Sequence, residues 1–532
     1  MKKLAVSNIA QYGDTDIFPY PIENALLYDK SEEVCNLISK IDNDFNEFIS
    51  HYPVEKFSTC IPVGLTGFRW ATQIDPLWNA YLLYLVLSVS ENIEKKRIPI
   101  SQNSVFSYRL AINKTTGKLF SETIGWRSFI ETTIKVAESE NFTHVIQLDI
   151  SDFYTRIYHH RLENALRRTG GNINTIKRIM RILQDLAGNS SYGLPIGGNS
   201  ARLLAELLLT DLDSMLSIKN IRFCRFVDDF IVFAKSKEES FRILNFIADF
   251  LLRNEGLSIQ KSKTQVLSSS EYANQAKHLL LGSDDDVPSK TRSNFLNLRI
   301  KYDPYSDTAE EDYENLKIEI SKFNIVSLLI EEVRKSRIHQ ALGRQLLNAV
   351  YFLNDMQIGL AFNTISSNPD AFYPIFSSVL RLANKCLHKV PEPYKNEFVT
   401  FLTSLINNDS YMVQNDNTLA YSVRALSKSD SEIAQQAIDR AFLKTTSPLV
   451  KANCIYAMAN RKCLFWISNL KSQFVTMTRQ ERRAFIAASY FLDDEGKHWR
   501  DHTKEQFLEF EFIVRDWVAE KMQSHKGWIL PI

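Results

Sequence analysis

Two adjacent acids between apolar segments constrain this chain more than any other feature. Asp228 and Asp229 interrupt the run Ile221–Ala234 (IRFCRFVDDFIVFA), which is otherwise rich in aromatic and β-branched residues. This pattern predicts a β-hairpin with both acids at its tip. Neighbouring carboxylates repel each other, and they are costly beside apolar strands unless a cation neutralises them. Taken alone, the pair indicates either a cation site or a solvated turn.

A third acid occurs in a comparable setting. Asp149 lies near the end of the apolar β run His144–Ile150 (HVIQLDI). Amphipathic helices are predicted at 161–187, 200–215 and 238–254, and strands alternating with helices in this order predict an α/β sandwich. Asp149 alone also suits a strand-end cap. Together, the three acids predict a site for hard divalent cations such as Mg²⁺, which prefer carboxylate oxygens.

Composition excludes several classes of protein. The chain has 532 residues, enough for about three domains. Its 33 Phe, 21 Tyr and 7 Trp residues argue against a mainly disordered chain. The net charge of +1 excludes a uniformly basic nucleic-acid coat but leaves room for a basic groove. Six dispersed cysteines, without a CxxC pair, argue against a zinc ribbon and a disulfide scaffold, and they favour a reducing cytoplasm.

Membrane association is not expected. The first residues turn polar before an apolar segment of signal-peptide length develops. The longest apolar stretch, around Ala80 to Val89, is too short to cross a bilayer. It belongs to Leu77–Ile93, which is apolar on nearly all sides and therefore predicts a buried helix. We expect a soluble cytoplasmic protein with no membrane partner.

Changes in pattern divide the chain into four predicted regions. Residues 1–125 are expected to be mostly helical, and 126–267 to form the α/β region. Residues 268–294 are rich in Ser, Asp and Lys and contain Gly282 and Pro288, so we predict a linker over residues 268–307. From residue 308 to 532 helical periodicity returns and strand patterns vanish. Successive helices joined by short polar turns predict either a bundle or a HEAT-like solenoid.

Four motifs in order carry a family resemblance. LDISDFYTRI, GLPIGGNSARLLAEL, FVDDF and GLSIQKSKT resemble the consecutive palm motifs of reverse transcriptases, and NSVFSYRLA resembles their fingers motif. The resemblance covers about residues 105–266. It implies an α+β fold, with a reverse-transcriptase fingers/palm domain followed by an all-α HEAT-like domain in place of a thumb. It also implies that Asp149, Asp228 and Asp229 are the catalytic acids and, with Ile150, bind two Mg²⁺ ions, with Mn²⁺ as an alternative.

The same resemblance implies a set of nucleotide contacts. Tyr154 falls where the family places an aromatic ring under the sugar, which would exclude a 2′-hydroxyl; a core aromatic is the other interpretation. Arg109 matches a basic residue that meets the triphosphate, where a surface salt bridge is the alternative. Lys263 matches a basic residue that serves the pyrophosphate, or is simply solvated. The glycine loop would approach the nucleotide through Gly193, Pro195 and Gly197, although Ile196 stands where the family usually has Gln.

A stretch rich in basic residues follows Asp149 in the sequence. Six basic residues and one acid, Glu163, lie between Arg161 and Arg181. Such a stretch can follow a phosphate backbone, although a solvated helical face explains it equally well. The predicted nucleic-acid contacts are Arg167, Arg168, Lys177 and Arg178.

A palm followed by some 220 helical residues resembles bacterial antiphage reverse transcriptases of the abortive-infection and "unknown group" classes. This implies DNA synthesis from dNTPs, a single-stranded DNA product and a homo-oligomer. Synthesis would be either untemplated and primed by a protein tyrosine, or templated by a partner non-coding RNA. The priming candidates are Tyr411, Tyr421, Tyr456 and Tyr490. A further spacing, Arg334 to His339, is used by some helical ribonucleases but also arises readily by chance.

Two other classes of function remain open at this point. A degenerate palm carrying an interaction solenoid would be a non-catalytic binding protein; the presence of all three acids and of Tyr154 argues against it. Another palm enzyme, such as a nucleotide cyclase or an RNA polymerase, is also conceivable. The cyclase lacks support because FVDDF replaces a GGDEF-like hairpin, and Tyr154 argues against the RNA polymerase.

Overall fold

The computed structural model describes residues 1–13, 17–63, 67–281, 295, 298, 300, 309–335 and 338–532. The chain divides into two compact units. Unit 1 consists of residues 1–14, 27–56 and 72–283, and unit 2 consists of residues 15–26, 57–71 and 284–532. Both units are therefore assembled from segments that are distant in the sequence.

Unit 1 is built around a four-stranded antiparallel sheet. Its strands are β3 (His144–Asp149), β4 (Phe223–Phe226), β5 (Asp229–Ala234) and β6 (Gln265–Ser268), in the order β4-β5-β3-β6. β4 and β5 form the hairpin that the acid pair predicts. Residues along β3 alternate between two sides, so Leu148 and Ile150, each 1% exposed, point away from the side that carries Asp149.

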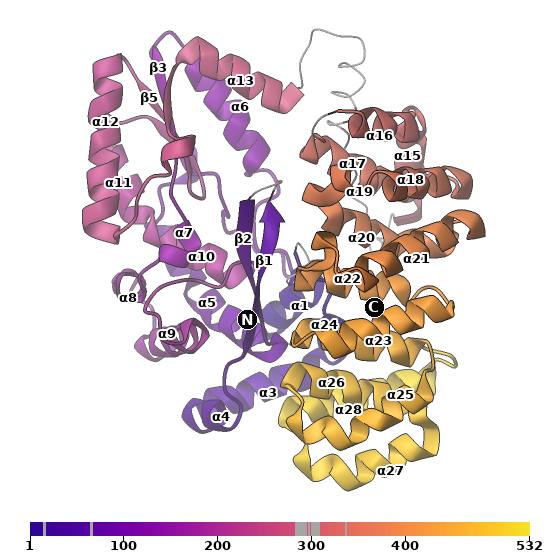
Figure 1. Ribbon diagram of the computed structural model, residues 1–532. Helices are drawn as coiled ribbons and strands as arrows, with labels where there is room; N and C mark the ends of the chain where they lie inside the picture. Colours follow the sequence, from indigo (N-terminus) through magenta and orange to yellow (C-terminus); the bar gives the residue numbers. More distant parts are fainter. Residues whose placement is uncertain are drawn as a thin grey trace. The chain divides into compact units, whose positions relative to one another are not determined.

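Helices cover both faces of this sheet (Figure 1). On one face, α6 (Trp126–Ala137) and α13 (Ser269–Leu281) pack on each other and on the strands. Their core includes Phe129, Val145 and Ile231. α12 (Lys237–Phe250) packs on β3 and β5 from the other side. Burial on both faces holds the strand ends, and therefore their acids, at fixed positions.

The remaining helices of unit 1 include one long buried helix. α5 (Pro76–Lys96) is the buried helix that the sequence predicts, with Asp75 as its N-cap. Two predicted helices are each split: Gly170, at φ +75°, separates α8 from α9, and α10 gives way to α11 at Leu209. The bounds are α1 (Lys2–Tyr12), α3 (Ser31–Asn43), α4 (Phe45–His51), α7 (Phe153–Arg156), α8 (His159–Arg168), α9 (Ile173–Ala187), α10 (Asn199–Leu208) and α11 (Thr210–Ile218).

Residues 1–125 contain more than the expected helices. β1 (Lys56–Val63) and β2 (Gly67–Ile74) form a separate two-stranded sheet. Most of this sheet belongs to unit 2, whereas its outer ends belong to unit 1. α2 (Ile22–Asp29) also spans the division between units. The sequence pattern of this region predicts mostly helices, so the two strands correct that prediction.

Unit 2 is helical over nearly all its described residues. In the row α20, α22, α24, α26 and α28, each helix packs on the next (orange to yellow in Figure 1). This fits the predicted all-α region, while the HEAT-like repeat stays a prediction. The bounds are α15 (Ala309–Ser321), α16 (Ile325–Val333), α17 (Gln340–Val350), α18 (Asp355–Ser367), α19 (Pro369–Phe372), α20 (Phe376–Cys386), α21 (Glu392–Asn407), α22 (Asp416–Leu426), α23 (Glu432–Lys444), α24 (Pro448–Asn460), α25 (Leu464–Asn469), α26 (Arg479–Ala488), α27 (Asp493–Thr503) and α28 (Glu509–Ser524).

The predicted linker 268–307 is not uniform. Residues 269–281 form α13 and belong to unit 1. Gly282, Pro288 and most of the remaining linker lie outside the described residues. None of the helices in the described part of the chain has the length and apolar character needed to cross a lipid bilayer.

Candidate active site

Strand pairing brings the three predicted acids together. The register of β3 and β5 ends with Asp149 opposite Asp229. β4 and β5 are joined by the two-residue turn Val227–Asp228, which begins after Phe226 and ends before Asp229. Asp228 therefore lies at the tip of the hairpin, next to the other two carboxylates, as the sequence predicts.

Electrostatics at this tip favour a bound cation. Burial, together with the negative charges of Asp149 and Asp229, raises the pKa of Asp228 to about 7. Hydrogen bonding to backbone and the charge of Lys263 oppose this shift without cancelling it. A carboxyl that resists ionisation for these reasons would ionise readily beside a cation.

Lys263 already places one positive charge at the site. It ends the short 3₁₀ helix Lys261–Lys263, and its ammonium pairs with Asp149 Oδ2. The hydrogen bond to Asp149 raises the pKa of Lys263. The backbone N–H of Gln260 donates to the Asp149 carbonyl at 2.7 Å. This bond fixes the QKSK segment against β3 and brings Lys263 to the acids.

Tyr154 and the glycine loop lie next to each other. Tyr154 belongs to α7, which follows Asp152 at φ +48°. The N–H of Leu194 donates to the Tyr154 carbonyl at 2.8 Å, and the N–H of Gly193 donates to the Ile157 carbonyl at 2.9 Å. Gly193 and Gly197, on either side of Pro195, have φ of +101° and +137°, which glycine adopts readily.

The Tyr154 phenol lies within electrostatic range of the acidic site. Burial raises its pKa well above the ordinary value, and Tyr108, Glu206 and Asp228 contribute in the same direction. The ring is therefore close enough to Asp228 to sense its charge. This position is compatible with the predicted contact to a nucleotide sugar.

Comparison with known proteins identifies the domain that contains these residues. Residues 91–300 match the family model described as "Reverse transcriptase (RNA-dependent DNA polymerase)". The chain carries a reverse transcriptase domain. That domain makes the protein an RNA-directed DNA polymerase, and it contains all three acids, Tyr154 and Lys263.

No curated protein matches the chain. Among solved structures, similarity extends to a telomerase from Candida albicans in complex with a TWJ fragment of telomeric RNA, at 11% identity. The match covers 77% of this chain and 69% of that chain, with a TM-score of 0.30. The apo telomerase from Candida tropicalis is 12% identical, with 71% of this chain and 70% of that chain covered and a TM-score of 0.30.

Reverse transcriptase domains use divalent metal ions, and the acids fit this requirement in their chemistry. Three carboxylates converge, one has a raised pKa, and an ammonium pairs with another. Across the described residues, no group of three or more His, Cys, Asp or Glu side chains is already arranged to hold an ion. Ile150 could contribute only its backbone carbonyl, because its side chain is apolar and buried.

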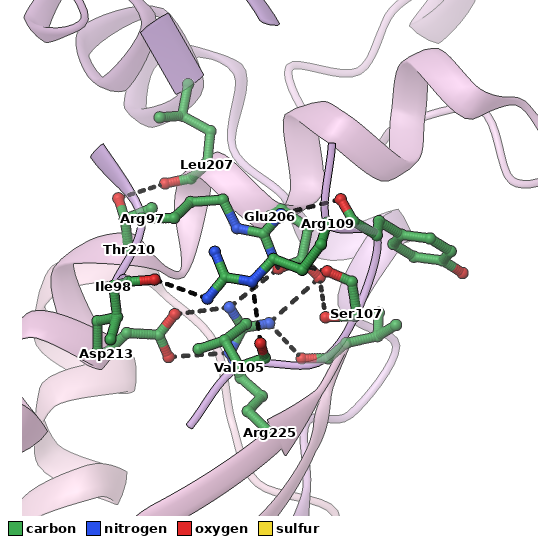
Figure 2. A network of polar contacts seen from close by, with 12 residues as sticks. Arg97, Ile98, Val105, Ser107, Arg109, Glu206, Leu207, Thr210, Asp213 and Arg225 are labelled. Atoms are coloured by element: carbon green, nitrogen blue, oxygen red, sulfur yellow. Dashed lines mark hydrogen bonds and ion pairs between the residues drawn. The ribbon is translucent and has the colours of Figure 1, made fainter. Parts of the chain in front are cut away.

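The structure corrects the prediction for Arg109, which is not available to a triphosphate. The residue is 1% exposed, and its guanidinium is enclosed by its own loop (Figure 2). Nε donates to the Val105 carbonyl at 3.0 Å, and Nη2 donates to the Ile98 carbonyl at 2.6 Å. Nη1 pairs with Glu94 at 2.9 Å. Arg109 therefore shapes the loop at residues 98–109 of the reverse transcriptase domain.

Arg202 is not among the residues predicted from the sequence. It is a better candidate than Arg109 for a contact with the nucleotide phosphates. It lies in the first turns of α10, directly after the glycine loop, and is only half-buried. Its guanidinium lies 5.2 Å from the centre of the Tyr108 ring, and its Nη1 donates to Asn199 Oδ1 at 2.9 Å. Its charge also reaches the Tyr154 phenol, where it opposes the rise in pKa that burial causes. The sequence feature that could have identified Arg202 is its place within the GLPIGGNSARLL motif.

The basic stretch does not form a row of unpaired charges. Arg167 pairs with Glu163 at 2.6 Å, and Arg168 pairs with Asp211 at 2.7 Å. Arg178 pairs with Asp42 at 3.0 Å and donates to the Tyr81 hydroxyl. Lys177 is exposed. Most of these acids are distant in sequence, so a local count of charges could not reveal the pairing. Nucleic-acid binding by the four residues stays a prediction.

The ribonuclease-like spacing in unit 2 has a structural explanation. Nδ1 of His339 accepts a hydrogen bond from the Leu342 N–H at 3.2 Å, which makes it the N-cap of α17. The His339 N–H donates to buried Glu332. The imidazole ring of His339 therefore caps α17, and Arg334 is exposed at the C-terminal end of α16.

Proposed function

We propose that this protein synthesises DNA from dNTPs by two-metal nucleotidyl transfer and acts in bacterial antiphage defence. The observation that carries the polymerase part is the strand register that sets Asp149 opposite Asp229, with Asp228 at the adjoining turn. The defence role, the bacterial cytoplasm, a homo-oligomeric state and a single-stranded DNA product are supported by the resemblance of a palm plus a helical region to antiphage reverse transcriptases.

Each residue of the site has its own proposed role. Asp149 and Asp228 would hold Mg²⁺, with Asp229 assisting and the Ile150 carbonyl completing the set. When bound, Mg²⁺ supplies the positive charge that eases deprotonation of a hydroxyl and stabilises pyrophosphate. The hydroxyl oxygen forms a bond to the α-phosphorus, the bond from that phosphorus to the bridging oxygen of pyrophosphate breaks, and the hydroxyl proton passes to solvent.

Two side chains add selectivity and charge balance. The Tyr154 ring would occupy the space that a 2′-hydroxyl needs, which favours deoxynucleotides. Lys263 balances the charge on Asp149 and is 63% exposed, so its ammonium can also meet an anionic leaving group. Ile196 stands where the family usually has Gln. This difference is compatible with DNA synthesis that depends only loosely on a template.

Protein priming is the first proposed mode of initiation, and burial separates the four tyrosine candidates. Tyr421 and Tyr456 are 4% and 3% exposed, and the Tyr490 ring is covered by Arg500 at 3.6 Å. Tyr411 is 48% exposed, and its hydroxyl donates to Asp370. Burial and this hydrogen bond raise the pKa of Tyr411 to about 12, so the phenol keeps its proton until a base removes it.

One incubation tests the proposal. Purified protein, Mg²⁺ and labelled dNTPs are combined without added template or primer, with co-purifying nucleic acid digested in one arm and intact in the other. Label on the protein after digestion would support untemplated, protein-primed synthesis, and Tyr411→Phe should abolish it. Label only in the intact arm would favour a non-coding RNA template, which sequencing would identify.

The controls separate chemistry from folding. Asp228→Asn removes a catalytic acid and should abolish incorporation in both arms. Asp185→Asn, at a carboxylate paired with Arg181, should have no effect. Absence of label from the wild-type protein in both arms would contradict the polymerase proposal for the isolated chain. A plaque assay with wild type and Asp228→Asn tests the defence role, which requires that protection depend on Asp228.

A further inference from the structure

The turn that carries Asp228 contains an unusual backbone conformation. Val227, the first of the two turn residues, has φ +57°. Glycine usually occupies such positions, and a β-branched residue there is an outlier. Val227 is also 8% exposed, so the strain is located in the interior of the domain. Strain of this kind persists only where the surrounding structure over-determines it.

Arg225 supplies that constraint. Its side chain is fully buried on β4, two residues before Val227. Nη1 donates to the Val227 carbonyl at 2.8 Å, which is the peptide that leads into Asp228. The other bonds go to two acids: Nε and Nη2 donate to Asp213 at 2.9 and 2.6 Å, while Nη1 and Nη2 donate to Glu206 at 3.3 and 3.0 Å. All five N–H donors of the guanidinium therefore have an acceptor.

Glu206 connects this turn to a second strained residue. Its carboxylate also accepts from the Ser107 hydroxyl at 2.5 Å and from Arg97 Nη2 at 2.7 Å (Figure 2). Arg97 in turn donates to the carbonyls of Ser107 and Tyr108, at 2.6 and 2.9 Å. Tyr108 has φ +44°, and it is close enough to the Tyr154 phenol to raise the pKa of that group. One buried carboxylate thus joins the turn of Asp228 to the loop of Tyr108.

The network is electrically balanced, which allows it to stay rigid without solvent. Arg97, Arg109 and Arg225 are matched by Glu94, Glu206 and Asp213. The charges of Arg225 and Arg97 outweigh burial and hold the pKa of Glu206 below its ordinary value. Burial raises the pKa of Asp213, and the charge of Arg225 opposes this rise. Both strained backbone segments are therefore held by a frame of buried ion pairs.

We propose that Glu206 and Arg225 are positioning residues that set the active-site geometry. Arg225 holds the Val227 peptide so that Asp228 faces Asp149, and Glu206 aligns this turn with the nucleotide side of the site at Tyr108 and Tyr154. The inference rests on the proposed metal-binding role of Asp228. It adds that cation affinity depends on a guanidinium that never touches the cation or the substrate.

The test compares Arg225→Lys with the wild type in the full chain. Lysine keeps the charge but concentrates three donors on one nitrogen, so it cannot serve Glu206, Asp213 and the Val227 carbonyl together. Mn²⁺ binding is followed by EPR without nucleotide, and dNTP incorporation is measured against metal concentration. We expect a five- to ten-fold weaker Mn²⁺ affinity and a similar rise in the metal concentration needed for half-maximal incorporation.

A matched buried arginine controls for lost stability. Arg483 is 3% exposed and pairs with Glu23 at 2.8 Å, both in unit 2. Arg483→Lys should lower the unfolding temperature and leave Mn²⁺ affinity unchanged. If Arg225→Lys does not fold, Glu206→Asp takes its place, because it keeps the charge and shortens the reach by one methylene. Unchanged Mn²⁺ affinity in a folded variant at either position overturns the proposal.

A second substitution identifies the route of the effect. Val227→Gly removes the steric need for a clamp, because glycine adopts φ +57° readily. The loss caused by Arg225→Lys should therefore shrink at least three-fold in the Val227→Gly background. An equal loss in both backgrounds would show that Arg225 does not act through this turn. If the wild type itself binds no Mn²⁺ and incorporates no dNTP, the proposed function fails rather than the positioning role.

Discussion

Two buried arginines of this protein have opposite electrostatic surroundings. Arg225 in unit 1 is bonded to two carboxylates and a carbonyl, and their charges outweigh its burial and raise its pKa. Arg424 in unit 2 is 5% exposed, donates from Nε to Asn453 at 2.5 Å, and forms no ion pair with a carboxylate of the described residues. Burial lowers its pKa to about 10.

The difference separates two kinds of buried charge. Balanced charges, such as Arg225 with Glu206 and Asp213, fix backbone geometry and are strongly coupled to one another. An unbalanced charge only adds a desolvation cost, which an apolar side chain of similar shape would avoid. The balanced group lies against the catalytic turn, whereas Arg424 lies among helices. Charge balance, rather than burial alone, therefore distinguishes a buried charge that fixes backbone geometry from one that only adds a desolvation cost.

The largest expected effect is that of Arg225→Met. Removing the guanidinium leaves Asp213 and part of Glu206 buried without a counter-charge, which typically costs about 3–5 kcal/mol. Urea unfolding of the full chain should show a loss of this size, assigned to unit 1 by hydrogen exchange at β4 and β5. The triple variant Arg225→Met, Glu206→Gln, Asp213→Asn removes all three charges and should recover part of the loss. A cost below about 1 kcal/mol for Arg225→Met would contradict the distinction between balanced and unbalanced buried charges.

A buried carboxyl of unit 1 that forms no ion pair with the described residues tests whether balance or location matters. Glu255 is 8% exposed, its Oε2 has no hydrogen-bond partner, and burial raises its pKa to about 7. The charges of Arg161 and Arg168 lower its pKa without cancelling the effect of burial. The folded state then holds this proton at pH values where the unfolded state has lost it. Stability from this group is complete below about pH 4.5 and is lost as pH rises towards 7, by up to about 3 kcal/mol.

The measurement is urea unfolding of wild type and Glu255→Gln between pH 5 and pH 8. Glutamine keeps the shape and cannot ionise, so the variant should lose less stability over this range. Because Asp228 contributes a trend of the same sign, only the difference between the two proteins is assigned to Glu255. Parallel curves would mean that the carboxyl finds a counter-charge in solution.

The selectivity of the site provides a smaller effect. Tyr154→Ala should raise the use of ribonucleotides relative to deoxynucleotides by about ten-fold or more, which corresponds to about 1.4 kcal/mol. Competition between labelled rNTPs and dNTPs gives this ratio directly. Tyr154→Phe keeps the ring and should leave the ratio unchanged. A Tyr154→Ala variant with unaltered preference would show that the ring does not sense the 2′ position.

The three acids are easier to predict from the sequence than the buried network of Arg97, Glu206 and Arg225 that holds their turn. The hairpin at Asp228 and the strand end at Asp149 follow from alternation and turn chemistry, which are local. The partners of Arg225 and Arg97 are not local: Glu206 lies 19 residues from Arg225 and 109 from Arg97. Arg109 was assigned to the wrong environment for the same reason, since Glu94 and two carbonyls enclose it only after the loop has folded. Strand patterns at 56–74 were overlooked among helices.

The smallest expected effect is that of Arg424→Met, and it tests the other side of the comparison. Methionine fills a similar volume without a charge, so the cost of burying the guanidinium disappears while Asn453 loses one donor. These changes should nearly cancel, leaving the unfolding free energy within about 1 kcal/mol of wild type. Adding Asn453→Leu removes the orphaned acceptor and should make the double variant at least as stable as the wild type. Metal-dependent dNTP incorporation should stay unchanged in both variants. A loss of several kcal/mol, or of activity, would place Arg424 with the balanced charges and would mean that a partner holds it in solution.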